Sequence, residues 1–124
     1  MAQVELDNTW ITHIPPHDVR PKLEAFLRRY HIRIKHQDEN QITGTHGLPL
    51  AANVLGSRLV KPGMWPKQIT IRLEQTPAGM QLHVKLEDLS TSHMLARRRE
   101  RYYSYFVWLM NALKAELPPA KYYR

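Results

Sequence analysis

The part of the sequence with the strongest chemical character is a block of arginines that leads directly into aromatic residues. Arg97, Arg98 and Arg101 precede Tyr105 and Trp108, and helical spacing places most of these side chains roughly on one side. Guanidinium groups bind phosphates and exposed rings stack on bases, so one interpretation is an anion or nucleic-acid surface. The other is a buried aromatic helix whose first turns reach the surface, because aromatic residues at helical spacing usually belong to a core.

A second group of cations lies earlier in the chain, between Arg20 and Lys35, and it includes Arg28, Arg29 and Arg33. The chain as a whole has 18 Lys and Arg against 11 Asp and Glu, a formal net charge of +7. A surface with this bias attracts polyanions, including nucleic acid. A solvated basic face that only keeps the protein soluble would explain the same charges.

Residues for metal binding or catalysis do not come together in a recognisable pattern. His13 and His17 are four residues apart, but Pro15 and Pro16 lie between them and prevent a shared helical face. The absence of cysteine excludes disulfides and thiolate chemistry. The serines lie in no Gly-x-Ser-x-Gly frame. The sequence therefore predicts neither a metal site nor a cofactor, and it supports no enzymatic reaction.

Length and composition are those of one folded domain. The chain has 124 residues, of which 43% are hydrophobic, and a chain of this size builds a single core. No signal peptide or membrane-spanning run is visible, so we expect a cytoplasmic protein without a membrane span. We expect the domain to cover residues 1–119 and residues 120–124 to form a mobile tail. The oligomeric state stays open.

The first half of the chain predicts one strand, one helix and one hairpin. Residues 4–11 alternate between apolar and polar and predict the first strand, which Pro15 and Pro16 end. Asp18 is a candidate N-cap for a helix of about three turns. Residues 31–46 predict a β-hairpin. Residues 47–66 are the hardest to place, since they fit either a strand with a bulge or a short helix followed by a loop.

The second half predicts a hairpin and a long helix. Residues 69–86 alternate on both sides of a Pro/Gly turn and predict two strands with one buried face. A helix from about His93 to Leu117 follows, with its N-cap in residues 90–92 and an apolar stripe at Leu95, Tyr102, Phe106, Leu109, Leu113 and Leu117. The predicted fold is α+β: a curved, mostly antiparallel sheet packed on a long C-terminal helix, with one shorter helix after the first strand.

This order of elements, with the segment from Gly63 to Pro66 leading into the strand from Ile69 to Leu73, resembles the helix-grip or START-like superfamily. The resemblance implies a curved sheet that wraps the last helix, with a gap between them that often holds a lipid, hormone or polyketide. Trp65 lies in a loop that leads into the best strand, and Trp108 lies in the middle of the helix. We therefore expect any ligand near Trp65, Tyr105 and Trp108. Alternatively, both indoles simply fill the core.

Two functions from different classes follow from these patterns. The first is a non-catalytic binding domain of helix-grip type that holds a small apolar ligand or a protein partner. The second is a nucleic-acid-binding domain that uses the clusters from Arg20 to Lys35 and from Arg97 to Arg101. The sequence alone identifies no ligand.

Overall fold

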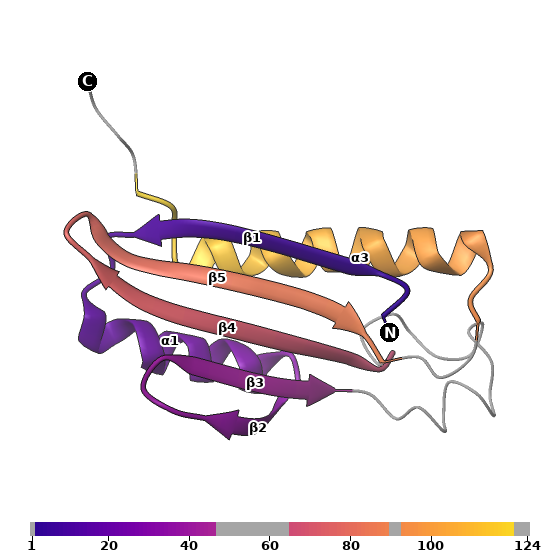
Figure 1. The fold of residues 1–124 in the computed structure, drawn as a ribbon, viewed down its shortest axis with the longest axis horizontal. Coiled ribbons are helices and arrows are strands. Elements are labelled where there is room, and N and C mark those ends of the chain that lie inside the picture. Colours follow the sequence, from indigo (N-terminus) through magenta and orange to yellow (C-terminus); the bar gives the residue numbers. More distant parts are fainter. Residues whose placement is uncertain (1, 47–64, 90–92, 121–124) are drawn as a thin grey trace.

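The protein is an α+β domain in which one antiparallel sheet carries two helices (Figure 1). The structure is a computed structural model and describes residues 2–46, 65–89 and 93–120. The strands lie in the order β1-β5-β4-β3-β2, and every neighbouring pair is antiparallel. Along the chain the elements are β1 (Glu5–Thr12), α1 (Pro16–Arg29), β2 (Arg33–Gln37), β3 (Gln41–His46), β4 (Lys67–Thr76), β5 (Gly79–Asp88) and α3 (Ala96–Glu116).

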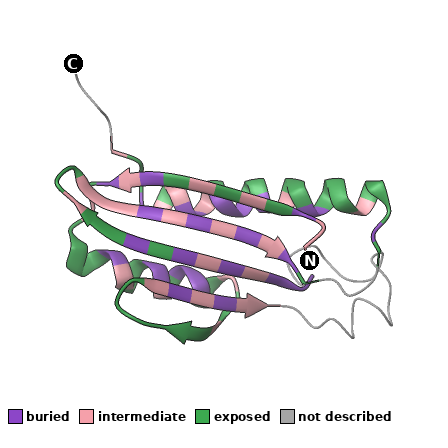
Figure 2. Ribbon diagram, in the orientation of Figure 1, coloured by how far each residue is buried: buried purple, intermediate pink, exposed green. Residues whose placement is uncertain are grey.

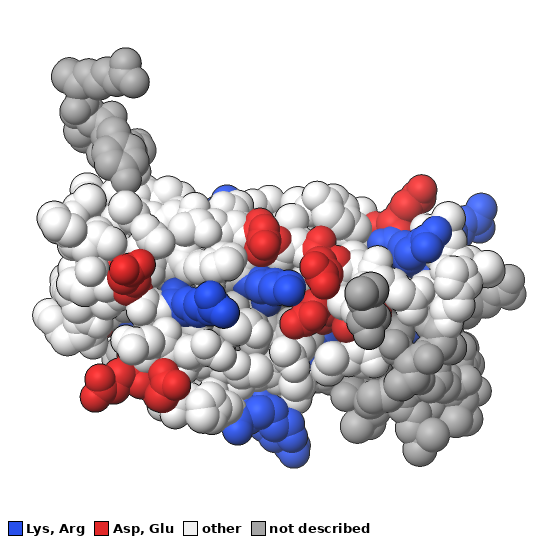
Figure 3. All heavy atoms as spheres, in the orientation of Figure 1, with Lys and Arg blue, Asp and Glu red and all other residues white. Residues whose placement is uncertain are grey.

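The two faces of the sheet differ because side chains alternate along each strand. Both helices lie on the same face (Figure 1), and burial alternates along β4 and β5 as that arrangement requires (Figure 2). The opposite face is open and mixes acidic with basic side chains (Figure 3). Two cross-strand pairs on it are Lys85 with Glu5 and His83 with Asp7, each at 3.9 Å. The open face is therefore polar and balanced in charge.

The core lies between the sheet and the helices. Helix α1 contributes Val19, Leu23, Phe26 and Leu27, and α3 contributes the buried set Tyr102, Phe106, Leu109, Met110 and Leu113. Apart from Met110, these α3 residues recur every three or four positions, which confirms the apolar stripe expected from the sequence except at its first member. The predicted α+β class, the antiparallel sheet and the long C-terminal helix that packs on it are confirmed.

Hydrogen bonds hold both ends of strand β1 in place. The Asp88 carboxylate accepts the backbone N–H groups of Gln3 at 2.7 Å and Val4 at 2.6 Å, which holds the start of β1 against the end of β5. At the other end of β1, the Trp10 indole donates to the Leu117 carbonyl at 2.8 Å. Because Glu87 and Asp88 point to opposite faces, Glu87 instead meets Gln68 on the open side, at 3.3 Å.

Both helices begin at residues other than those expected. Helix α1 begins at Pro16, so Asp18 lies in its first turn and is not its N-cap. Proline suits the first helical position, because its φ is preset and its missing N–H has no intrahelical partner there. Helix α3 begins at Ala96, three residues after the expected start, and Leu95 is 77% exposed where the sequence predicted a core position. Residues 90–92, the expected N-cap, lie outside the described residues.

Both predicted hairpins are present. The turn between β2 and β3 is held by the Asp38 carboxylate, which accepts the Asn40 N–H at 2.8 Å, and this hydrogen bond lowers the pKa of Asp38. Gly79 closes the turn between β4 and β5 with φ +136, a conformation that other residues rarely adopt. At the C-terminus, the Ala120 N–H donates to the Ile11 carbonyl at 2.6 Å. Of the expected tail, residues 121–124 lie outside the described residues, and so do residues 47–64 of the segment 47–66.

We predict that Phe106→Ala lowers the free energy of unfolding by about 3–5 kcal/mol, because a fully buried ring that packs against Tyr102 at 5.6 Å leaves a cavity. Urea denaturation followed by circular dichroism measures the change. Val107→Ala, at the next and more exposed position, is the matched control and should cost about 1 kcal/mol or less. A loss below about 1 kcal/mol for Phe106→Ala would show that α3 is not a core element.

Candidate functional site

One flank of α3, the side that faces β4 and α1, collects arginine and aromatic side chains. The members are Arg98, Arg101, Tyr105 and Trp108, spaced by three, four and three residues, and they are called the arginine–aromatic flank below. This spacing places them along one side of a helix over about 15 Å. None of them belongs to the fully buried stripe, so the flank borders the core without being part of it.

The N-terminal end of the arginine–aromatic flank is built around Trp65. The Trp65 ring is fully buried and lies 4.7 Å from the Tyr102 ring. The guanidinium carbons of Arg98 and Arg101 lie 5.4 and 5.5 Å from the centre of the same indole. A cation at this distance from an indole ring is attracted by its π electrons. Trp65 therefore holds two neighbouring cations in place.

Arg98 carries an unusual feature at this end. Its Nε is a buried donor that makes no hydrogen bond, whereas the side chain as a whole is only partly buried. A buried donor without an acceptor costs about 1–3 kcal/mol. Guanidinium groups satisfy Nε best with a planar anion that accepts from Nε and a terminal nitrogen together. The arrangement therefore favours an acceptor that the described residues do not supply.

The C-terminal end of the arginine–aromatic flank is an aromatic cluster that reaches solvent. Trp108 is 53% exposed, and its ring stacks on Tyr105 at 5.7 Å with an interplanar angle of 27°. Tyr30, just after α1, meets Trp108 edge-on at 5.6 Å. Burial raises the pKa of Tyr105, and the neighbouring Tyr30 raises it further. An indole held by two tyrosines with half its surface in water is a rigid apolar platform.

Lys67, the first residue of β4, lies beside the aromatic end of the arginine–aromatic flank. It is 1% exposed, and its ammonium lies 5.2 Å from the centre of the Tyr105 ring. Burial disfavours the charged form and lowers the pKa of Lys67 from 10.5 to about 7. A lysine that titrates near neutral pH beside a half-exposed aromatic cluster is a common property of functional sites. The sequence does not single out Lys67, because nothing in Lys67-Gln68 distinguishes it from a surface lysine.

The N-terminus of α3 concentrates positive charge. Residues 97–101 hold four arginines and one glutamate, and the first turn contains no acid. The N-cap, Leu95, provides no side-chain hydrogen bond. Helix dipoles disfavour cations at an N-terminus by about 0.3–1 kcal/mol each. This arrangement therefore opposes the stability of α3, and it increases the attraction of the arginine–aromatic flank for anions.

The earlier group of arginines lies beside the aromatic end and is only partly free to bind. Arg29 forms an ion pair with Glu116 at 3.1 Å, whereas Arg28 and Arg33 are exposed. Tyr30 lies between them in the chain and contacts Trp108, so one residue from the region of the earlier cluster belongs to the aromatic platform. Of the sequence-predicted site residues, Tyr105 and Trp108 lie in direct contact, and Trp65 packs at the opposite end with Arg98 and Arg101.

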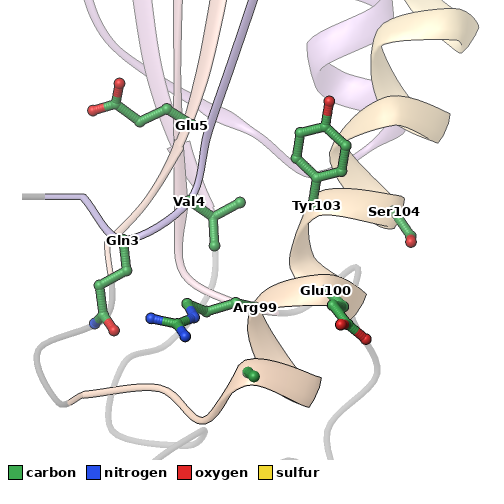
Figure 4. Close-up of a pocket in the computed structure, with 8 residues that line it drawn as sticks. Gln3, Val4, Glu5, Arg99, Glu100, Tyr103 and Ser104 are labelled. Atoms are coloured by element: carbon green, nitrogen blue, oxygen red, sulfur yellow. The ribbon is translucent and has the colours of Figure 1, made fainter.

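Three depressions lined by described residues lie elsewhere, and none includes Trp65, Tyr105 or Trp108. The largest, about 660 Å³, lies between the start of β1 and the other flank of α3 (Figure 4). Val4 and the exposed ring of Tyr103 stand on either side of it, and Arg99 extends beneath Val4 (Figure 4). Arg99 and Trp108 are nine residues apart and therefore point in opposite directions from the helix axis. This groove is separate from the arginine–aromatic flank.

Neither a metal centre nor a membrane helix is found in the part of the chain that the structure describes. Residues 2–46, 65–89 and 93–120 contain no group of three or more potential metal-ligating side chains. The helices within these same residues are too short or too polar to cross a membrane.

Comparison with known proteins supports the fold and goes no further. The sequence matches no protein-family profile, and no curated protein is similar to it. The crystal structure of protein MLL2253 from Mesorhizobium loti is similar over 90% of this chain and 95% of its own, with a TM-score of 0.54 at 12% sequence identity. At this identity the likeness shows that the α+β fold is shared.

We predict that the stability of the protein rises with pH above neutrality because of Lys67. Its pKa is about 7 in the folded protein and 10.5 when exposed, so between these values the unfolded chain binds a proton that the folded protein does not. The free energy of unfolding should therefore increase by about 2 kcal/mol more from pH 7 to pH 9 in the wild type than in Lys67→Met. Urea denaturation at several pH values measures the difference. Parallel curves for the two proteins would mean that Lys67 titrates normally.

We also predict that Arg97→Glu stabilises the protein. Arg97 is exposed in the first turn of α3, where an acid interacts favourably with the free N–H groups and a cation does not. The expected gain is about 0.5–1 kcal/mol, seen as a higher thermal midpoint, and Arg97→Gln should give roughly half of it. A lower thermal midpoint for both variants would show that Arg97 makes a stabilising contact.

Proposed function

We propose that this protein is a non-catalytic binding domain of helix-grip type whose ligand, a small and largely apolar molecule, lies against the arginine–aromatic flank of α3. The observation that carries this proposal is the exposure of Trp108, which is 53% open to solvent although it is held by Tyr105 and Tyr30. An aromatic ring fixed by its neighbours loses little conformational freedom when a ligand stacks on it. Such a platform is suited to binding.

The order of the elements supports the helix-grip part of this proposal. The N-terminal strand β1 pairs with β5, the last strand, and α3 then crosses back over the face that these strands share with β4. In this arrangement the start of β4 packs against the middle of α3. Lys67 and Tyr105 meet there. Ligand sites in proteins combine apolar walls with a few placed polar groups of this kind.

A second candidate function is the binding of single-stranded nucleic acid. The specific observation in its favour is that the exposed Trp108 shares α3 with the exposed Arg101 and contacts Tyr30, which follows the exposed Arg28 by two residues. Proteins that bind single strands combine cations for the backbone with aromatic rings for the bases. Binding of this kind weakens steeply as salt rises, whereas binding of a neutral apolar ligand does not.

The proposed function is tested with 2-naphthamide, a neutral aromatic probe, by isothermal titration calorimetry. We predict that Trp108→Ala weakens its binding about tenfold, because a stacked ring contributes about 1–3 kcal/mol. Trp108→Phe keeps an aromatic surface and should retain most of the affinity. Tyr103→Ala is the matched control, since Tyr103 is an exposed aromatic on the other flank of α3.

Two results would contradict the proposed function. One is the absence of binding to the wild type, and the other is an equal loss in Tyr103→Ala and Trp108→Ala. Tight binding of an oligothymidylate that is lost at high salt, without binding of 2-naphthamide, would favour the nucleic-acid function.

A further inference from the structure

The arginine–aromatic flank has two chemically different ends on one helix. Arg98 and Arg101 lie at one end, and the stacked pair of Tyr105 and Trp108 lies at the other. Arg101 and Trp108 are seven residues, or about 10 Å, apart along α3. This length matches a molecule of two fused rings with one substituent. A ligand of this length whose apolar part rests on Trp108 would therefore extend along α3 as far as the level of Arg101.

The arginine end is short of an acceptor. The Nε of Arg98 makes no hydrogen bond, and four arginines against Glu100 give residues 97–101 a strong positive charge. In the described part of the chain, ion pairs are found for Arg29 and Lys85 but not for Arg98 or Arg101. Arginines three residues apart on a helix are neighbours, so both can reach one anion. The missing partner is a group with two coplanar oxygens.

We infer that the ligand of this site is an aromatic or similarly flat apolar carboxylate, whose ring stacks on Trp108 and whose carboxylate accepts hydrogen bonds from Arg98 and Arg101. This inference rests on the proposed function and adds the ligand class to it. Arg98 turns its guanidinium edge toward the carboxylate, so that Nε and a terminal nitrogen donate together. The bound ligand gives the Arg98 Nε an acceptor, so the free-energy cost of the unsatisfied donor is present only in the ligand-free protein.

Lys67 supports an anionic ligand from the β4 side. Its ammonium lies 5.2 Å from the centre of the Tyr105 ring, on which Trp108 stacks. An anion bound along this flank favours the charged form of a buried lysine, because an opposite charge offsets the desolvation. The titratable groups beside Lys67 in the described residues are Asp88, its pairing partner on β5, and Tyr105 on α3.

The experiment compares 2-naphthoate with 2-naphthamide, which differ only in that the carboxylate is replaced by a neutral amide of the same shape. Isothermal titration calorimetry at pH 7 should show that 2-naphthoate binds roughly ten- to hundredfold more tightly, as expected for charge-assisted hydrogen bonds. Arg98→Gln and Arg101→Gln should each reduce this ratio toward one while the affinity for 2-naphthamide stays unchanged. The unchanged affinity also shows that the variants are folded.

Two further variants separate hydrogen-bond geometry from charge. Arg98→Lys keeps the positive charge but loses Nε and the two-nitrogen edge, so it should lose most of the preference for 2-naphthoate. Arg99→Gln removes the same charge from the other flank of α3 and should leave the ratio unchanged. Equal losses in Arg98→Gln and Arg99→Gln would reduce the effect to general charge attraction and overturn the inference.

The remaining outcomes distinguish the inference from the proposed function. If both probes bind the wild type equally, the domain binds apolar ligands but has no carboxylate site, and only the inference fails. If neither probe binds, the proposed function fails with it. If an oligothymidylate binds more tightly than 2-naphthoate and responds to Arg98→Gln and Arg99→Gln alike, the arginines serve a nucleic-acid backbone and the inference is overturned.

Discussion

The carbonyl of Pro66 is the point at which β4, β5 and α3 are joined. It accepts the Tyr102 hydroxyl at 2.8 Å and the Leu89 N–H at 3.1 Å, and Trp65 packs its ring on Tyr102 beside it. This contact fixes the rotation of α3 over the sheet. It thereby decides that the flank with Arg98 and Trp108 faces β4 and α1, while the flank with Tyr103 faces β1. The candidate site depends on this rotation of α3, because the rotation sets which side chains lie beside β4.

Several features that oppose stability occur together on the same flank. A buried lysine with a pKa near 7, a buried Nε without a hydrogen bond and a cation-rich helix N-terminus each cost free energy in the folded state. Each would be removed by a simple substitution. The rest of the described fold is locally consistent, with alternating strands, a continuous apolar stripe on α3 and balanced charge on the open face of the sheet. Departures of this kind, gathered in one place, are typical of functional sites.

Charge is distributed unevenly between the two sides of the molecule, so a protein of net charge +7 can have a sheet face in which acidic and basic side chains balance. The open face pairs Lys85 with Glu5 and His83 with Asp7, whereas α3 has five cations against two acids. The excess of positive charge in α3 is thus placed on the helical side, where a ligand would meet an apolar platform and guanidinium groups at once. An anion attracted by the overall charge is more strongly held beside α3 than on the sheet.

The sequence by itself determined the fold class, both hairpins and the core stripe of α3, because side-chain periodicity follows directly from the geometry of strands and helices. It also indicated Trp65, Tyr105 and Trp108 as residues of interest, because Trp65 lies in a Pro/Gly-rich loop before a strand and the other two follow a run of arginines. It did not indicate that Lys67 or Tyr30 belongs to the candidate site, and it placed exposed Leu95 in the core. The burial of Lys67 and its contact with Tyr105 arise only when β4 packs under α3. A pKa, a missing hydrogen bond and a shared aromatic platform depend on neighbours that lie far apart in the chain, so only the tertiary structure could decide them.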